Sequence, residues 1–383
     1  MDDPKPHTGA KTGDGKQAAE AGILEGLADP VILLDRRGCI LDCNFAAREL
    51  LGGEPVGIEL AGALNSPEIA RTLAAVRAGD TRQRTEVLIP FPVSHAYELH
   101  IWELPEETAG KEVWAILVLH DVTAAKKTEQ MRADFVSNVS HELRSPLSSL
   151  LGFIETLRGP ARDDADARAR FLEIMEAEAK RMTRLINDLL TLSKVETAEH
   201  IRPEGVVDVV DLLNRVADIL SVRAKERGMT IAVEAENGRP KVLGDADELT
   251  QVFQNLVANA ITYGSEGTPI RMVVGPAAAV PGTGAAGVAV AVVNQGEGIP
   301  PDDISRLTER FYRVDKGRSR SMGGTGLGLA IVKHIVNRHR GHLHIESAQG
   351  RETTFTVHLP FAARGDSERA SRGGARRSVD AGA

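Results

Sequence analysis

His141 stands directly beside a carboxylate, in a motif that also contains a proline. His141 is followed by Glu142, and Pro146 comes five residues after the histidine. A neutral imidazole nitrogen is a nucleophile at physiological pH, and an adjacent carboxylate can accept its proton. Such a pair on a helix is a weak signal by itself, so its chemistry depends on what the rest of the chain supplies.

The apolar residues around His141 predict a long amphipathic helix over residues 124–158. They recur every three or four positions, which is the spacing of a buried helical stripe. The stripe is Val136, Val139, Leu143, Leu147, Leu150, Ile154 and Leu157. His141 lies two positions from Val139 and from Leu143, roughly 200° around the helix from each. We therefore expect the imidazole to face solvent.

A second long helix is predicted over residues 165–196, after Gly159 and Pro160 end the first. Its apolar face is Phe171, Met175, Met182, Leu185, Leu189 and Leu192, with Glu178 interrupting. Two such helices joined by a short loop form an antiparallel hairpin. One hairpin cannot cover both stripes, so we expect a homodimer that forms a four-helix bundle.

Residues 203–362 alternate between helical and strand patterns. Helices are predicted over 209–227, 245–263 and 326–339, and strands over 229–234, 270–274, 288–293, 342–347 and 353–359. Helices on one face of a mixed sheet make an α/β sandwich.

Three features of this third segment suit a nucleotide. Asn255 and Asn259 share one face of a predicted helix, and amide oxygens are ligands that Mg²⁺ accepts. Asn294 begins a turn with a Gly-x-Gly pattern after a strand. A glycine-rich loop, residues 323–328, opens a helix whose N-terminus and backbone N–H groups suit phosphate. Each feature is weak alone, and their order after the His141 motif makes the signal strong.

Residues 21–123 predict a compact α+β domain with a hairpin over 30–44 and strands over 85–90, 97–103 and 113–119. The run 29–38 with Asn44 and the later Asp121-Val-Thr123 resemble a PAS sensor domain. His95 and His100 could bind haem, but single strand histidines are usually structural. Cys39 and Cys43 lack further ligands nearby, so we read them as small core residues rather than a metal site.

In order and spacing, the motifs over residues 124–362 resemble the two-component sensor histidine kinases, with an ATP-binding domain of the GHKL type. The resemblance implies a multidomain α+β protein that uses ATP and Mg²⁺. It implies that His141 is the phosphoacceptor and Glu142 its proton acceptor. Asn259 is then the Mg²⁺ ligand, supported by Asn255, and the phosphoryl group passes to an aspartate of a response regulator.

The resemblance assigns further residues to the site. Those implied to bind nucleotide are Asn255, Asn259, Tyr263, Asn294, Gly296, Gly298, Arg313, Lys316, Gly324, Thr325, Gly326, Leu327 and Gly328. Asn294 and Gly298 fall where the family holds adenine, and Gly324 to Gly328 fall in the lid over the triphosphate. Ser145, one turn after His141, is the position from which many members assist dephosphorylation of the regulator. The run 311–334 looks most like the phosphate-regulon sensor kinases.

Two positions depart from the family pattern. Asn294 replaces the usual Asp, and an amide can accept from adenine or donate to guanine. We expect ATP to remain the substrate with weakened discrimination against GTP. Thr262 replaces a frequent Lys, so one phosphate-neutralising charge is missing, which Arg313, Lys316 or Arg318 can supply. A pseudokinase that acts as a scaffold or phosphatase is therefore the main alternative. A chaperone-type or mismatch-repair-type ATPase does not explain the His141 motif, and a PAS ligand-binding protein ignores most of the chain.

Composition bounds the remaining possibilities. The formal net charge of −8 over 383 residues argues against nucleic-acid binding. We expect the segments 1–20 and 363–383 to be disordered, which leaves a sensor domain (21–123), a phosphotransfer hairpin (124–200) and an ATP-binding domain (203–362). No window has the roughly 18 apolar residues of a membrane helix, and residues 1–20 lack a signal-peptide pattern. The predicted location is cytoplasmic. Because phosphate-regulon sensors are usually anchored in the inner membrane, membrane association through partners or through an anchor further upstream stays open.

Overall fold

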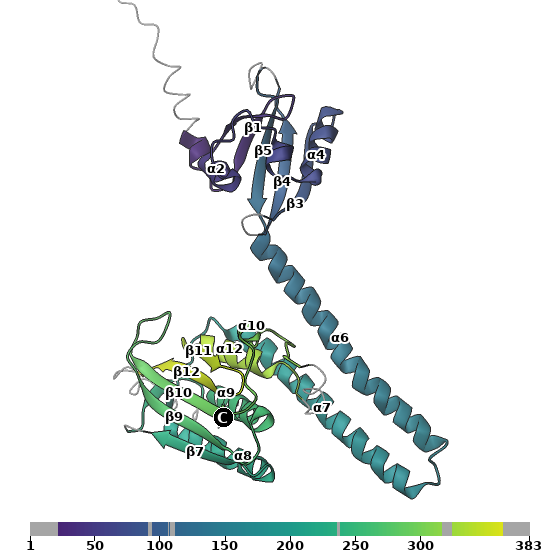
Figure 1. Cartoon of the computed structure of the whole chain (residues 1–383), viewed down its shortest axis with the longest axis vertical. Helices are drawn as coiled ribbons and strands as arrows, with labels where there is room; N and C mark the ends of the chain where they lie inside the picture. Colours follow the sequence, from purple (N-terminus) through teal and green to yellow (C-terminus); the bar gives the residue numbers. More distant parts are fainter. Residues whose placement is uncertain are drawn as a thin grey trace, which may run out of the picture. The chain divides into compact units, whose positions relative to one another are not determined.

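The chain divides into two compact units, residues 1–134 and residues 135–383 (Figure 1). The computed structural model describes residues 22–90, 94–105, 107, 112–235, 238–315 and 324–362. The segments predicted to be disordered, 1–20 and 363–383, lie outside the described residues, as do Lys316 and Arg318.

The first unit is built on one antiparallel sheet with strand order β2-β1-β5-β4-β3. Its strands are β1 (Val31–Leu34), β2 (Ile40–Cys43), β3 (Arg82–Ile89), β4 (His95–Glu103) and β5 (Ala115–Asp121), and its helices are α2 (Phe45–Leu51), α3 (Leu60–Ala63) and α4 (Pro67–Arg77). The predicted hairpin over 30–44 is confirmed by the pairing of β1 with β2. Side chains alternate along β4 and β5, so one face of the sheet packs against the helices and forms a single core.

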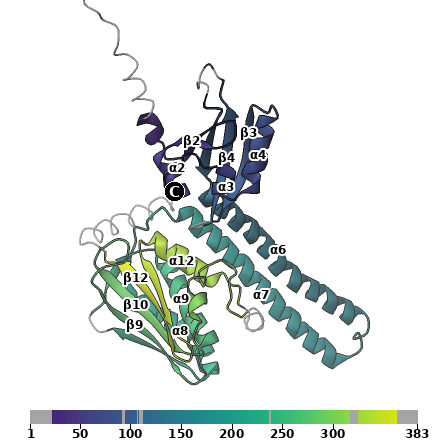
Figure 2. The same ribbon diagram turned by 45° about the horizontal axis from the view of Figure 1, so that its top comes forward.

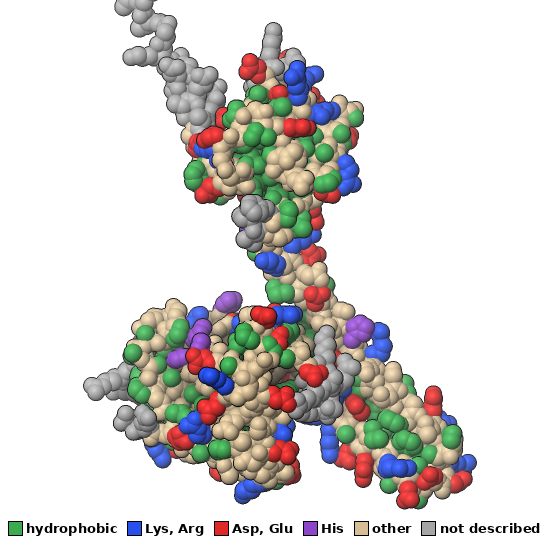
Figure 3. All heavy atoms as spheres, viewed as in Figure 1, with side chains coloured by type: hydrophobic (Ala, Val, Ile, Leu, Met, Phe, Trp, Pro, Cys, Tyr) green, Lys and Arg blue, Asp and Glu red, His purple; other side chains and the backbone are tan. Residues whose placement is uncertain are grey.

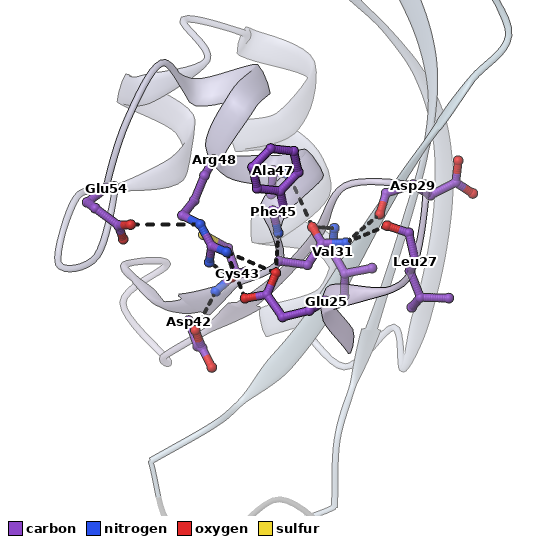
Figure 4. Close-up of polar contacts among 11 residues, drawn as sticks. Glu25, Leu27, Asp29, Val31, Asp42, Cys43, Phe45, Ala47, Arg48 and Glu54 are labelled. Atoms are coloured by element: carbon purple, nitrogen blue, oxygen red, sulfur yellow. Dashed lines mark hydrogen bonds and ion pairs between the residues drawn. The ribbon is translucent and has the colours of Figure 1, made fainter. Parts of the chain in front are cut away.

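Polar contacts fix the segment before β1 against helix α2 (Figure 4). The carboxylate of Glu25 accepts two hydrogen bonds from Arg48, at 2.7 and 2.9 Å. Asn44 is fully buried, and its Oδ1 accepts from the N–H of Val31 at 2.9 Å and of Ala47 at 3.0 Å. The second of these bonds caps α2. Asn44, part of the PAS-like pattern in the sequence, therefore has a structural role, since it connects the segment before β1 to helix α2.

Two long helices form the predicted hairpin. Helix α6 (Thr123–Arg158) begins in the first unit, and helix α7 (Ala165–Ala198) follows after a short turn. Asp164 caps α7 by accepting from the N–H groups of Asp166 and Ala167. The predicted inner face of α7 is confirmed, since Leu185 and Leu192 are buried in the core of this unit.

The apolar stripe on α6 is partly exposed in the single chain, in keeping with the prediction that one hairpin cannot cover both stripes. Leu143 packs against the core, but Val136 is 63% exposed, Leu147 50% and Ile154 39%. Figure 3 shows hydrophobic side chains on the surface of the hairpin near its turn. The reason is geometric, because a two-helix hairpin covers only part of each apolar stripe.

The rest of the second unit is an α/β sandwich, as predicted. Its elements are β6 (Val206–Asp208), α8 (Val209–Glu226), β7 (Thr230–Ala235), β8 (Lys241–Leu243), α9 (Ala246–Tyr263), β9 (Pro269–Ala277), β10 (Gly287–Gln295), α10 (Pro301–Ile304), α12 (Gly328–Arg338), β11 (His342–Ser347) and β12 (Glu352–Pro360). The main sheet has the order β11-β12-β10-β9-β7, with β7 and β9 parallel and the other pairs antiparallel. Helices α8, α9 and α12 cover one face of this sheet (Figure 2).

Alternation of side chains explains the one-sided packing. In β12, Thr353, Phe355, Val357 and Leu359 are buried, while the residues between them are half-buried. Facing them, α9 buries Leu249, Val252, Phe253, Leu256, Val257, Ala260 and Ile261. Across the described ranges, no helix has the length and apolar character that a membrane crossing requires.

Candidate active site

His141 lies on an exposed face of α6, as its helical phase predicted. Ser145, one turn further along the helix, is exposed as well. Pro146 is buried within the same helix and lacks the N–H that would bond the carbonyl oxygen of Glu142. The segment that carries His141 is therefore accessible to solvent, and its helix lacks one backbone hydrogen bond at Pro146.

The carboxylate of Glu142 points toward the second helix of the hairpin. Its Oε2 accepts a hydrogen bond from the guanidinium of Arg181 in α7, at 2.7 Å. The two side chains are only 18% and 12% exposed, so this ion pair is well shielded from solvent. The role of proton acceptor for His141 stays a prediction, and no local pattern in the sequence indicates this competing partner 39 residues away.

Helix α9 presents the predicted asparagines beside the glycine-rich loop. Asp245 caps the helix by accepting from the N–H groups of Asp247 and Glu248. Asn255 is half-buried, and its amide nitrogen donates to the carbonyl oxygen of Gly328 at 3.4 Å. Asn259, one turn later, is also half-buried on the same side of the helix. The predicted metal-ligating face therefore borders the predicted phosphate loop.

The other end of α9 meets the Gly-x-Gly turn. Gly264 and Gly296 form an isolated antiparallel bridge, which places Tyr263 next to this turn. Gly298 has φ +76°, and a Cβ at this position would lie 2.1 Å from the carbonyl oxygen of Ala348. Only glycine fits such a place, because both the dihedral angle and the space exclude a side chain. The glycine pattern thus has a definite structural cause.

Asn294 is buried at the end of β10, where it is 5% exposed. Its register partner on β12 is Thr353, which is buried to the same degree. The amide nitrogen of Asn294 donates to the carbonyl oxygen of Gln295 at 3.3 Å. In this orientation the amide oxygen is the atom left to accept a hydrogen bond from a base.

The loop before α12 is held by its own residues and by Phe311. Gly326 has φ +74°, and its carbonyl oxygen accepts from the N–H of Phe311 at 2.8 Å. A Cβ on Gly326 would stand 2.9 Å from the Cα of Phe311. Leu327 is fully buried and anchors the loop in the core. Gly324, Thr325 and Gly328 complete the loop at the start of an eleven-residue helix, a position suited to an anion.

The residues on α9 fit a magnesium nucleotide. Mg²⁺ in such sites takes few protein ligands and is held largely by phosphate oxygens and water. Asn259 can supply one oxygen on the face that borders the phosphate loop. In the part of the chain that the structure describes, no group of three or more His, Cys, Asp or Glu side chains is arranged to hold a metal ion.

The structure also brings in residues that the sequence did not single out, namely Asp188, Glu196, Arg223 and Arg310. Thr325 donates to Asp188 of α7 at 2.7 Å, and Arg310 pairs with Glu196 of α7 at 2.7 Å. Burial raises the pKa of the Asp188 carboxyl. Arg223 of α8 donates to the hydroxyl of Thr262 at 3.0 Å. These partners are 137, 114 and 39 residues apart, so no local pattern indicates them.

His339 links the two helices that bear the nucleotide residues. It is fully buried at the end of α12, and its Nε2 accepts from the N–H of Asp245 at 3.0 Å. Its Nδ1 bonds the carbonyl oxygen of Ile335 at 2.8 Å, so Nδ1 carries the proton of a neutral ring. Burial lowers the pKa of His339. The ring therefore ties the end of α12 to the start of α9.

An open depression of about 780 Å³ adjoins this region but is a different surface. It is lined mainly by the turn between β11 and β12, together with Ser265 and Gln295. Among the predicted nucleotide residues that the structure describes, only Gly296 borders it. Of the remaining predicted residues, Tyr263 is 48% exposed and Arg313 is half-buried two residues after Phe311.

Two domain families match the second unit. Residues 131–198 match the His Kinase A (phospho-acceptor) domain, and residues 244–363 match the Histidine kinase-, DNA gyrase B-, and HSP90-like ATPase family. The first match contains His141, and the second contains Asn255, Asn259, Asn294 and the glycine-rich loop. Both families were expected from the order of the motifs.

Two relatives in sequence, PhoR and WalK, agree with these matches. The phosphate regulon sensor protein PhoR of Pseudomonas aeruginosa is 35% identical over 350 residues, which cover 90% of this chain and 74% of PhoR. The sensor histidine kinase WalK of Bacillus subtilis is 32% identical over 357 residues, which cover 91% of this chain and 56% of WalK. The chain thus spans little more than half of WalK. The histidine kinase ThkA, solved in complex with the response regulator protein TrrA, aligns with a TM-score of 0.48 at 21% identity over 89% of this chain and 98% of that chain. The identity to PhoR, together with the two domain matches, shows that this chain belongs to the sensor histidine kinases, a family of protein-histidine kinases.

Proposed function

We propose that this protein phosphorylates His141 from ATP and passes the phosphoryl group to an aspartate of a response regulator. The observation that carries the proposal is the pairing, within one unit, of an exposed histidine on a phosphoacceptor hairpin with a helix and loop suited to a nucleotide. Asn255 contacts Gly328 across that helix and loop. A protein of the chaperone ATPase kind has no use for the hairpin histidine.

The proposed reaction needs only ATP and the imidazole of His141 as reactants. An imidazole nitrogen of His141 attacks the γ-phosphorus, the bond to the β–γ bridging oxygen breaks, and ADP leaves. Glu142 takes the imidazole proton as general base. Catalysis by the protein consists mainly of positioning and of neutralising phosphate charge. Mg²⁺, with Asn259 as its protein ligand, would neutralise charge on the β- and γ-phosphates.

Labelling with [γ-³²P]ATP and Mg²⁺ tests the phosphoacceptor. We expect a label that is stable to alkali and lost in acid, as a phosphoimidazole is, and that is absent from His141→Gln. Label that survives in this variant would move the phosphoacceptor elsewhere. The alternative of a catalytically weak pseudokinase, which acts as scaffold or phosphatase, rests on Asn294 and Thr262 and requires an unlabelled wild-type protein that still binds nucleotide.

The regulator and the signal are finer proposals. Similarity to PhoR, a phosphate regulon sensor protein, supports a role in phosphate starvation, while similarity to WalK leaves other regulators to be tested. Transfer from the labelled protein to each response regulator of the host distinguishes the two. A kinetic preference for the regulator of phosphate-starvation genes would support the first, and a preference for any other regulator would contradict it.

Ser145 gives the exposed face of α6 a proposed second activity. Its hydroxyl stands one turn from His141 and can position a water molecule for hydrolysis of the regulator's phosphoaspartate. Ser145→Ala should slow this dephosphorylation while autophosphorylation continues. Ser148→Ala, an exposed neighbour on the same helix, is the matched control. Equal dephosphorylation rates in the Ser145 and Ser148 variants would exclude the role.

We propose a second copy of this chain as the occupant of the exposed stripe on α6. Val136, Leu147 and Ile154 on α6 and Leu190 on α7 (66% exposed) are the side chains that a four-helix bundle would cover. Light scattering should show a dimer for the wild type and a monomer for Leu147→Glu with Leu190→Glu.

We propose that the first unit is a PAS-like sensor. It is an antiparallel sheet in which helices α2 to α4 are inserted between strands β2 and β3.

A further inference from the structure

Thr262 occupies a place on α9 that faces the same way as the nucleotide asparagines. At 100° per residue, Asn255, Asn259 and Thr262 fall within an arc of roughly 60° on the helix. A cation at position 262 would therefore stand beside the metal-ligating face. Threonine supplies no charge, and its short side chain leaves room where a lysine would extend.

Arg223 brings a guanidinium to this position from the neighbouring helix α8. Its Nη2 donates to the hydroxyl of Thr262 at 3.0 Å, and that hydroxyl donates in turn to the carbonyl oxygen of Ala258 at 2.7 Å. Arg223 is exposed, so its side chain can move toward a ligand at little cost in desolvation.

Arg227, a second arginine on α8, has a structural role that differs from the role of Arg223. Arg227 bonds the carbonyl oxygens of Ile261 and Thr262 and pairs with Glu266 at 3.3 Å. Arg227 therefore ties the end of α9 to α8, and the carboxylate of Glu266 balances its positive charge. Arg223 instead contacts a neutral hydroxyl on the side of α9 that bears Asn259. Arg227 therefore already links α8 to α9, one helical turn after Arg223.

We propose that Arg223 contacts the nucleotide phosphates and supplies from α8 the positive charge that Thr262 lacks on α9. The inference rests on the proposed use of ATP. A guanidinium binds phosphate oxygens with a fixed fork of donors, so it can replace an ammonium at this place. The sequence-based candidates Arg313, Lys316 and Arg318 lie in the chain between Phe311 and the glycine-rich loop. Arg223 precedes α9 and was not among them.

Charge rescue tests this inference on the full chain. Arg223→Gln should weaken binding of a fluorescent, non-hydrolysable ATP analogue about tenfold, because a charge-assisted contact is lost. Thr262→Lys in the same chain should restore affinity to within about threefold of the wild type. Arg215→Gln removes another exposed arginine of α8 and should bind as the wild type does.

Adenosine separates a phosphate contact from a structural role, since it has no phosphate. Its affinity should be equal in the wild type and in Arg223→Gln. A variant that loses adenosine as well, or that Thr262→Lys does not restore, would assign Arg223 to helix packing and overturn the proposal. Unchanged binding of the ATP analogue by Arg223→Gln would overturn it too, while labelling of wild-type His141 would leave the proposed function intact. Failure of the wild type to bind or to become labelled would instead refute the proposed function.

Discussion

The hydroxyl of Thr325 donates a 2.7 Å hydrogen bond to the carboxylate of Asp188. Thr325 belongs to the glycine-rich loop predicted to close over phosphates, and Asp188 belongs to helix α7 of the phosphoacceptor hairpin. Nearby, Arg310 pairs with Glu196 of α7 at 2.7 Å, and the rings of Phe135 and Phe311 lie 5.9 Å apart. The loop that would hold the nucleotide is therefore engaged by the hairpin in this structure.

Asp188→Ala should release this loop. A net hydrogen bond contributes about 1 kcal/mol, so we expect an increase of roughly fivefold in the initial rate of autophosphorylation. Asp188→Asn keeps an acceptor for the Thr325 hydroxyl and should resemble the wild type. Asn187→Ala, an exposed neighbour on α7, is the control for a change in the helix. A slower Asp188→Ala enzyme would show that the contact promotes catalysis rather than restraining it.

Glu142→Gln should lower the rate of autophosphorylation by roughly 10²-fold, because the imidazole proton loses its acceptor. Affinity for an ATP analogue should stay unchanged, since Glu142 lies on α6 and pairs with α7. The substitution also breaks the pair with Arg181, so Arg181→Gln is the matched control. If both variants lose the same activity, the ion pair and not proton transfer explains the loss.

Asn294→Asp should sharpen the choice of ATP over GTP. The buried amide can turn to donate toward a guanine oxygen, whereas a carboxylate only accepts. Competition between labelled ATP and unlabelled GTP in the autophosphorylation assay measures this ratio for both proteins. An equal ratio would mean that Asn294 does not read the base.

Acid should destabilise the nucleotide domain through His339. Its folded pKa is lowered by burial, below the unfolded value of about 6.5. In the interval between these two values the unfolded chain binds more protons, so stability falls as the pH falls through it. Melting temperatures at about pH 7.5 and about pH 5.5 should differ less for His339→Gln than for the wild type. His344→Gln, an exposed strand histidine, should keep the wild-type difference.

The fold was predictable wherever a period in the sequence reports burial directly. The stripes of α6 and α7, the one-sided alternation of β12 and the buried face of α9 follow from spacings of three to four or of two. Gly298 and Gly326 were predictable for a related reason, since their positive φ angles admit little else. For α6, periodicity shows that one face is apolar and is more than a single hairpin can cover, but it does not identify what covers the rest.

The sequence alone determined the chemical parts of this protein: an outward-facing His141, the asparagine face of α9, the glycine turn and the glycine loop. Each is encoded within a few neighbouring residues. Only the tertiary structure decided their partners, namely Arg181 for Glu142, Asp188 for Thr325, Arg223 for Thr262 and His339 for the start of α9. These contacts join residues 39 to 137 positions apart. Such pairs depend on how helices pack across the core, which no local pattern of residues records.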